Sequence, residues 1–485
     1  MSHCTQSEKP PDAKTKKETQ RQMMLEGSLL KIIPVIAVPI IISMVVDSLY
    51  NMTDTYFVSR LGTVATAAVG VNDSLMQYIR ALAMGFGVGA SSYLSRLLGA
   101  RKDGEANQVA STILFTSVGI MVILAAVTQV FLSPIVTWLG ATPSIKAYSM
   151  DYARFILISA PFTAGEVVLS QILRSEGSSK YAMIGTVTGC VINIALDPLF
   201  ISVWGLGVAG AAIATTVSKV ISLAVLLFPF LKKKTMLELH RRFFTPKWVL
   251  YLEVIKMGVP TLLRAVLQAS SFVLMYNVAG QFGDVALAAV SISKKYVGLI
   301  SSAIMGFGQG FQPLAGFCWG AKKYRRMRDA FWTYTFIGWV AAALLGAGMG
   351  IASKRLVLIF TTPEETELVR LGSLMILSQC CVLIPHVWGV VVNGLCQGIG
   401  KPVHSTLVGL ARNFICLMPC VLILPKLMGD NGLAISQAAA DVLSLVIVLP
   451  VAVYMLRKTK SCEITQSAHS LNQAEAVSTE NSQQT

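Results

Sequence analysis

The sequence predicts an all-α membrane protein whose twelve transmembrane helices form two pseudo-symmetric six-helix bundles. Of its 485 residues, 54% are hydrophobic and only 13% are charged, whereas a typical soluble domain carries about 25% charged residues. In addition, the pattern from Pro39 to Ala100 recurs without a gap from Pro260 to Ala321, at a constant offset in residue number (260 − 39 = 321 − 100 = 221). A repeat of this length indicates that one helical bundle was duplicated.

Each expected helix is an apolar run of roughly 20 residues or more, which is long enough to cross a bilayer. In chain order, the runs occupy residues 30–57, 64–97, 108–138, 147–173, 181–203, 208–231, 252–280, 284–318, 328–352, 366–396, 403–426 and 431–456. They form an N-lobe over residues 29–231 and a C-lobe over 251–456, joined by the polar linker 232–250. The polar ends, residues 1–28 and 457–485, are expected to be disordered and cytoplasmic.

The basic residues indicate the orientation of the helices. The chain has 40 Lys and Arg against 25 Asp and Glu, a net charge of +15. These basic residues gather in alternate connections, including the ends of the chain and the linker, where Lys232 to Lys234 lie. By the positive-inside rule both termini are cytoplasmic. Because topology explains the basic excess, we expect no nucleic-acid partner.

Several patterns exclude other classes of function. Gly205 to Gly210 matches a dinucleotide-binding pattern but follows an apolar helix and not a strand. Gly398 to Pro402 resembles part of a P-loop, but the spacing fails and Pro402 replaces the Ser or Thr that would hold magnesium. The five histidines are dispersed and form no nucleophile–base pair, so we expect neither an enzyme nor a cofactor. Duplicated parallel bundles around a shared cavity are instead the usual construction of secondary transporters.

Polar residues within the first, fifth and sixth apolar runs form a candidate cation site. Asp54 lies near the end of the first run, Asn193 and Asp197 share one face of the fifth, and Ala211 and Thr215 share one face of the sixth. Their oxygens suit Na⁺, or a proton shared between carboxyl groups. Alternatively, Asp54 is an interfacial helix-end residue and Asp197 caps a turn. Spacing alone leaves both interpretations open.

The chain resembles the multidrug and toxin extrusion (MATE) antiporters, and their DinF-like branch more than their NorM branch. The similarity covers residues 30–456 and is most specific in four motifs: Asp54 to Val58 with Gly62, Leu173 to Gly177, Asn193 to Pro198, and Gly306 to Gly310. It implies a V-shaped pair of lobes in a bacterial inner membrane. It also implies export of amphipathic, often cationic drugs or metabolites by antiport with H⁺ or Na⁺, with one chain able to work as a monomer.

The resemblance also implies roles for particular residues. The N-lobe cation site of the family falls on Asp54, Asn193, Asp197, Thr215 and the carbonyl of Ala211, and the four side chains are the ligands for Na⁺ if Na⁺ is the coupling ion. The acids that the NorM branch carries in its C-lobe are replaced by Gln268 and His386. We therefore expect no cation site in the C-lobe.

Five further residues are expected to line the substrate cleft or to take part in gating: Pro39, where the family bends its first helix, and Asp47, Tyr50, Arg264 and Gln309. Asp47 either attracts a cationic substrate or pairs with a base. Arg264 is expected to pair with a carboxylate or with carbonyls. The alternative function is a flippase for lipid-linked oligosaccharides, which requires a larger and more basic central cavity.

Overall fold

The structure is a computed structural model that describes residues 13–359, 361 and 364–483, and all regular secondary structure in this part of the chain is helical. The first half contains α1 (Ala13–Glu26), α2 (Leu29–Ser59), α3 (Thr63–Gly99), α4 (Asp103–Val130), α5 (Leu132–Trp138), α6 (Lys146–Ser175), α7 (Ser179–Pro198), the π-helix η1 (Leu199–Val203) and α8 (Gly207–Leu231). The second half contains the 3₁₀ turn η2 (Arg241–Phe243), α9 (Trp248–Gln281), α10 (Asp284–Gly320), α11 (Tyr324–Leu358), α12 (Thr366–Cys381), α13 (Leu383–Ile399), α14 (Pro402–Leu410), the π-helix η3 (Ala411–Cys416) and α15 (Leu417–Gln483).

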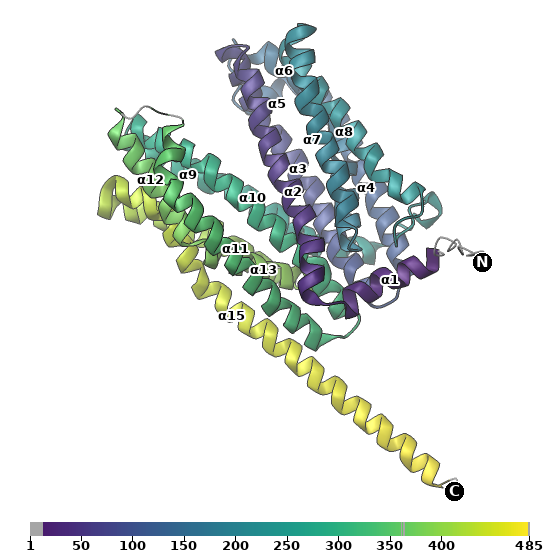
Figure 1. Ribbon diagram of the computed structural model, residues 1–485. Helices are drawn as coiled ribbons and strands as arrows, with labels where there is room; N and C mark the ends of the chain where they lie inside the picture. Colours follow the sequence, from purple (N-terminus) through teal and green to yellow (C-terminus); the bar gives the residue numbers. More distant parts are fainter. Residues whose placement is uncertain (1–12, 360, 362–363, 484–485) are drawn as a thin grey trace, which may run out of the picture.

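These helices form two arms that meet at one end and diverge toward the other, so the molecule has the predicted V shape (Figure 1). In the described part of the chain, eight helices are long and apolar enough to cross a membrane, or nine if the bent pair α12 and α13 forms one span. Helices α3 (37 residues) and α9 (34 residues) are also long enough to cross a membrane and pack against each other beside them. The segment Pro402–Ala468 contains two crossings, because the chain reverses at Gly429 (φ 63°) and Ser436 then lies beside Cys420. The twelve predicted crossings are thus all present.

The sequence repeat is also a structural repeat. Helices α3 and α10 both have 37 residues, and each begins after a glycine with positive φ: Gly62 (103°) and Gly283 (94°). Each is followed by a residue in the left-handed region, Arg101 (φ 61°) and Lys322 (φ 56°). Both pairs are related by the offset of the sequence repeat. Positive φ favours glycine, so the repeated glycines preserve the same turn in both lobes.

The two lobes are joined by two equivalent contacts, in each of which a helix of one lobe packs against a helix of the other. Gly85 of α3 packs against Leu262 of α9, and Gly306 of α10 packs against the Ile41 backbone of α2. Nearer the joined end, a Cβ atom added at Gly320 would lie 2.0 Å from the carbonyl oxygen of Arg96. Such close backbone contact requires small residues. The lobe interface is therefore built from α2, α3, α9 and α10.

The prediction of disorder for residues 1–28 is wrong over 13–26, which form α1; residues 1–12 lie outside the described part of the chain. Arg21 donates to the carbonyl of Leu98 (3.2 Å) and pairs with Asp103 (2.5 Å) in the N-lobe. Lys323 of the C-lobe pairs with Glu26 (3.0 Å). The polar side chains of α1 thus bind both lobes and not only water. Composition alone does not show such contacts, so it predicted disorder.

The prediction of disorder for residues 457–485 is wrong over 457–483, because α15 continues to Gln483 and projects beyond the bundle (Figure 1). An ion pair between Arg328 and Glu463 holds the first part of this extension against α11. The linker runs from Lys232 to Lys247, and two of its backbone N–H groups bind the buried carboxylate of Glu176. The linker is therefore anchored to the end of α6.

Candidate functional site

The fifth and sixth predicted helices meet at the candidate cation site. Asn193 and Asp197 lie on one face of α7 and are almost fully buried, at 1% and 0% exposure. When the Asn193 amide is oriented to satisfy both neighbours, its nitrogen donates to Asp197 Oδ2 (3.1 Å) and its oxygen accepts from the backbone N–H of Thr215 (3.2 Å). Ala211 is fully buried one turn before Thr215 on α8. The structure therefore brings these four residues together.

Helix α2 adds Asp54 to this group. Asp54 is half-buried and lies within electrostatic range of Asp197. Its Oδ1 atom is buried and has no hydrogen-bond partner among the described residues. One turn earlier, the hydroxyl of the buried Tyr50 lies within hydrogen-bonding reach of Thr215. The convergence of α2, α7 and α8, which spacing alone left open, is thus present.

Sequence reasoning missed Asp73, which lies on α3 within electrostatic range of Asp54. Its neighbour Asn72 is fully buried and donates to the side chain of Ser149 (2.8 Å), which fixes this part of α3 against α6. The sequence feature that could have revealed Asp73 is the consecutive Asn72–Asp73 pair inside an apolar run.

Within the described residues, no three Asp, Glu, His or Cys side chains are grouped so that they could hold a metal ion.

Among the described residues, two ion pairs join different helices elsewhere in the N-lobe, one of them part-buried and the other buried. Asp47 pairs with Arg80 of α3 (2.5 Å), so of its two predicted roles the structure supports pairing with a base. Glu166 of α6 pairs with Lys219 of α8 (2.8 Å), and the two side chains are 5% and 12% exposed. Lys219 was missed by sequence reasoning, although a single lysine in the sixth apolar run was a sufficient signal.

Gln309 connects the lobes. Its side-chain oxygen accepts from Arg174 Nη1 (2.8 Å) and from Gln171 Nε2 (3.3 Å), both on α6. On the helix that contains Pro39, the Ser43 hydroxyl donates to the Pro39 carbonyl one turn earlier (2.8 Å). Such a hydrogen bond often bends a helix. Gln309 thus lies at a contact between the lobes, whereas the gating role of Pro39 stays a prediction.

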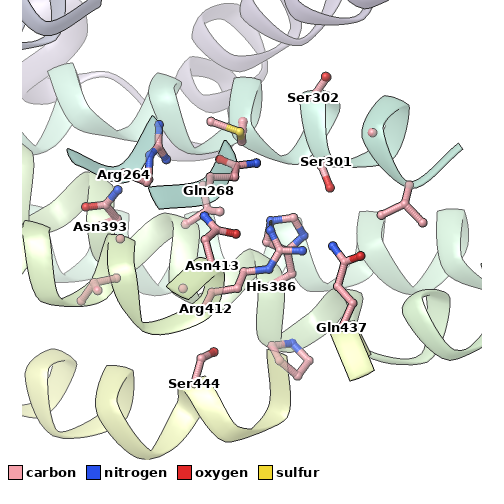
Figure 2. Close-up of a pocket in the computed structure, with 18 of the residues that line it drawn as sticks. Arg264, Gln268, Ser301, Ser302, His386, Asn393, Arg412, Asn413, Gln437 and Ser444 are labelled. Atoms are coloured by element: carbon pink, nitrogen blue, oxygen red, sulfur yellow. Dashed lines mark hydrogen bonds between the residues drawn. The ribbon is translucent and has the colours of Figure 1, made fainter. Parts of the chain in front are cut away.

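The C-lobe contains a cavity of about 290 Å³. Figure 2 shows polar side chains of α9, α10, α13, η3 and α15 around it. Arg412 Nη1 contacts His386 Nε2 (2.9 Å) and the same guanidinium pairs with Asp441 of α15. The predicted pairing of Arg264 is wrong: it has no hydrogen-bond or ion-pair partner among the described residues, and its charged neighbour is Arg412. Its side-chain stem lies over Gly409 of α14.

The family model MatE matches residues 39–199 and 260–423, which lie in the two lobes. The chain belongs to the MatE family. Two similar proteins are the multidrug export protein MepA of Staphylococcus haemolyticus (26% identical over 426 residues, 88% of this chain and 93% of that protein) and that of Staphylococcus aureus strain NCTC 8325 / PS 47 (26% over 443 residues, 91% and 97%). This MatE protein is accordingly a multi-pass membrane transporter and not an enzyme.

Solved MATE structures share the fold. A crystal structure of MATE in complex with MaL6 has a TM-score of 0.86 and 26% identity, and covers 90% of this chain and 99% of that chain. The outward-facing conformation of a multidrug resistance MATE family transporter has a TM-score of 0.83 and 26% identity, and covers 90% and 98%. The V-shaped fold predicted from the resemblance is confirmed, while the DinF-like branch stays a prediction.

Proposed function

We propose that this MatE protein is a secondary active exporter of amphipathic organic compounds, often cationic, driven by inward flow of H⁺ or Na⁺. The observation that carries the proposal is the buried Asp54 Oδ1, which has no hydrogen-bond partner in the described part of the chain, together with the neighbouring group of Asn193, Asp197 and Thr215. The names of its MepA relatives, which describe multidrug export, support the direction and class of transport.

The basic residues indicate how the proposed exporter is oriented in the membrane. The joined end of the V holds α1, the C-terminal extension and the basic connections (Figure 1), so it is the cytoplasmic end of a protein in the bacterial inner membrane. The arms then diverge toward the outside. Because one chain contains both lobes, it works as a monomer.

Electrostatic repulsion couples the ion to the conformation. Two carboxylates in a medium of low dielectric constant repel each other, and a proton or a cation between them relieves this repulsion. For Na⁺, the Asn193 amide, the Thr215 hydroxyl and the Ala211 carbonyl would supply neutral oxygens. Binding alters the charge on α2, which also contacts the C-lobe. The ion can shift the lobes only by the difference between its affinities for the two conformations.

The test is dye efflux from proteoliposomes under separately imposed proton and sodium gradients. We expect D54N and D197N to lose gradient-driven efflux of a cationic dye by at least about tenfold, because each removes one charge from the site. The matched control is D151N, an exposed aspartate of α6 that pairs only with Arg154 on its own helix among the described residues. Unchanged ion-driven efflux by well-expressed D54N and D197N would contradict the site.

The alternative flippase function requires a large basic central cavity. The basic cavity of this structure lies within the C-lobe, and about 290 Å³ is close to the lower limit of ordinary ligand pockets. This cavity lies within one lobe and not between the two, and the MepA relatives are named for multidrug export, so the exporter is the better supported function.

A further inference from the structure

The C-lobe cavity is lined by side chains of one charge. Arg264, Lys294 and Arg412 line it, and no Asp or Glu does. The charges come from three separate elements, α9, α10 and η3. Because isolated charges at membrane depth are costly, each requires a compensating group.

The compensation is incomplete. Arg412 is neutralised by Asp441, whose carboxylate also accepts from Gln379 and lies outside the cavity lining. The Lys294 ammonium lies 4.5 Å from the ring centroid of Phe272 and 4.9 Å from that of Tyr276, which attracts it without cancelling its charge. Arg264 is left without a counter-charge among the described residues.

The cavity also contains more hydrogen-bond donors than its own acceptors use. Arginine can only donate, so Nε2 of His386 accepts from Arg412 and the ring proton lies on Nδ1. His386 is 3% exposed, and its Nδ1 has no partner in the described structure. A buried donor without a partner costs free energy, so His386 adds no acceptor that could balance the positive charge of Arg264.

The two lobes have opposite charges at an equivalent position. Lys294 of α10 is the counterpart of Asp73 of α3 under the offset of the repeat (294 − 73 = 221), and Asp73 lies within electrostatic range of Asp54. In addition, Arg412 and Asn413 lie on the π-helix η3, a distortion that is frequent at functional sites. The duplication therefore left an acidic site in one lobe and a basic cavity in the other.

We infer that the C-lobe cavity binds the anionic group of an amphipathic organic ligand, a carboxylate, sulfonate or phosphate held by Arg264 and Arg412. Phe272, Val297, Met305, Val390 and Val408 of the same lining form the apolar wall against which the rest of the ligand packs. If the ligand is also cargo, which rests on the proposed function, the exporter carries anionic or zwitterionic amphiphiles in addition to the expected cationic ones.

The test measures equilibrium binding of three small probes with the same ring system to the full-length protein in phosphatidylcholine nanodiscs: 2-naphthoate (anionic), 2-naphthalenemethanol (neutral) and 2-naphthylmethylammonium (cationic). We expect naphthoate to bind best and R264Q to weaken it roughly tenfold to hundredfold, as for loss of a charged hydrogen bond. R264K should restore part of the loss. The neutral probe reports whether R264Q still forms the cavity, and R355Q, an exposed arginine of α11, is the matched control.

Equal binding of naphthoate and naphthalenemethanol, or unchanged naphthoate binding in R264Q, would overturn the inference. Repeating the titration with phosphatidylglycerol in the nanodisc identifies the source of the anion: competition assigns the cavity to a lipid headgroup, and no competition assigns it to a soluble anion. Failure of the proposed function is separate, because it appears as unchanged ion-driven efflux in D54N and D197N, or as no gradient-driven efflux by the wild type, while Arg264-dependent binding is the same.

Discussion

The ion pair between Glu166 and Lys219 gives a sharp prediction about the stability of the N-lobe. The Lys219 ammonium lies 2.8 Å from the carboxylate, and the side chains are 12% and 5% exposed. Ser222 donates to the other carboxylate oxygen (2.9 Å). In K219M this hydrogen bond remains, but the carboxylate loses its counter-charge while staying buried. Breaking a buried pair in this way costs about 3–5 kcal/mol.

For a lobe of about 200 residues, this loss corresponds to a fall of roughly 6–20 °C in apparent Tm. Thermal unfolding of purified protein in detergent, followed by tryptophan fluorescence, measures it. The double variant E166Q/K219M removes both charges and should recover most of the loss, because neither group is then buried without a partner. The matched control is K102M, which breaks the exposed pair with Glu105 and should cost less than about 1 kcal/mol.

Unfolding of K219M at the same temperature as K102M, or a double variant less stable than K219M, would contradict a buried charge pair at this position. The first result would mean that Lys219 is hydrated in the folded protein. The second would mean that the polar groups themselves, and not the balance of their charges, hold α6 against α8.

Two further predictions concern the joined end of the V. Burial raises the pKa of Glu176 from 4.5, its value in an unfolded chain, to about 7. The folded protein therefore binds the proton more tightly than the unfolded chain, and this stabilises the fold by on the order of 3 kcal/mol or less. The contribution is complete below pH 4.5 and is lost as the pH rises through 7. E176Q should show a smaller fall in apparent Tm between pH 5 and pH 8 than the wild type, and an equal fall would contradict the assignment. G320A should lower the free energy of unfolding by about 1–3 kcal/mol, because its Cβ would lie 2.0 Å from the Arg96 carbonyl oxygen. The control G119A places its Cβ in open space and should not destabilise the protein. Equal Tm values for these two variants would show that the lobe contact is loose.

Much of the fold could be predicted because a repeat is visible without knowledge of any contact. The constant offset between the two halves identified both glycines that start α3 and α10, and the structure gives Gly62 and Gly283 nearly the same φ. The spacing of Asn193 and Asp197 likewise required only helix geometry. Local periodicity and duplication are properties of the chain itself, so the sequence is sufficient to reveal them.

The partners of buried charges could not be predicted, because they depend on which helix faces meet. Glu166 and Lys219 lie in different apolar runs with a third run between them, and nothing in either run specifies the rotation that brings them together. The same limit made the predicted pairing of Arg264 wrong. Composition also gave a wrong prediction for α1. Its polar residues predicted disorder, but Arg21 is only 5% exposed and its side chain binds Leu98 and Asp103.

Helix α2 provides a direct physical route from the proposed ion site to the C-lobe. Asp54 lies near one end of this helix, and toward its other end the Ile41 backbone lies against Gly306 of α10. Helix α10 in turn contributes Lys294 to the basic cavity. If ion binding shifts α2, we expect α10 to move or become strained, because a glycine contact leaves no flexible side chain to absorb the shift. We therefore expect coupling between the lobes to follow from packing that the duplication itself created, without a separate chain of polar residues.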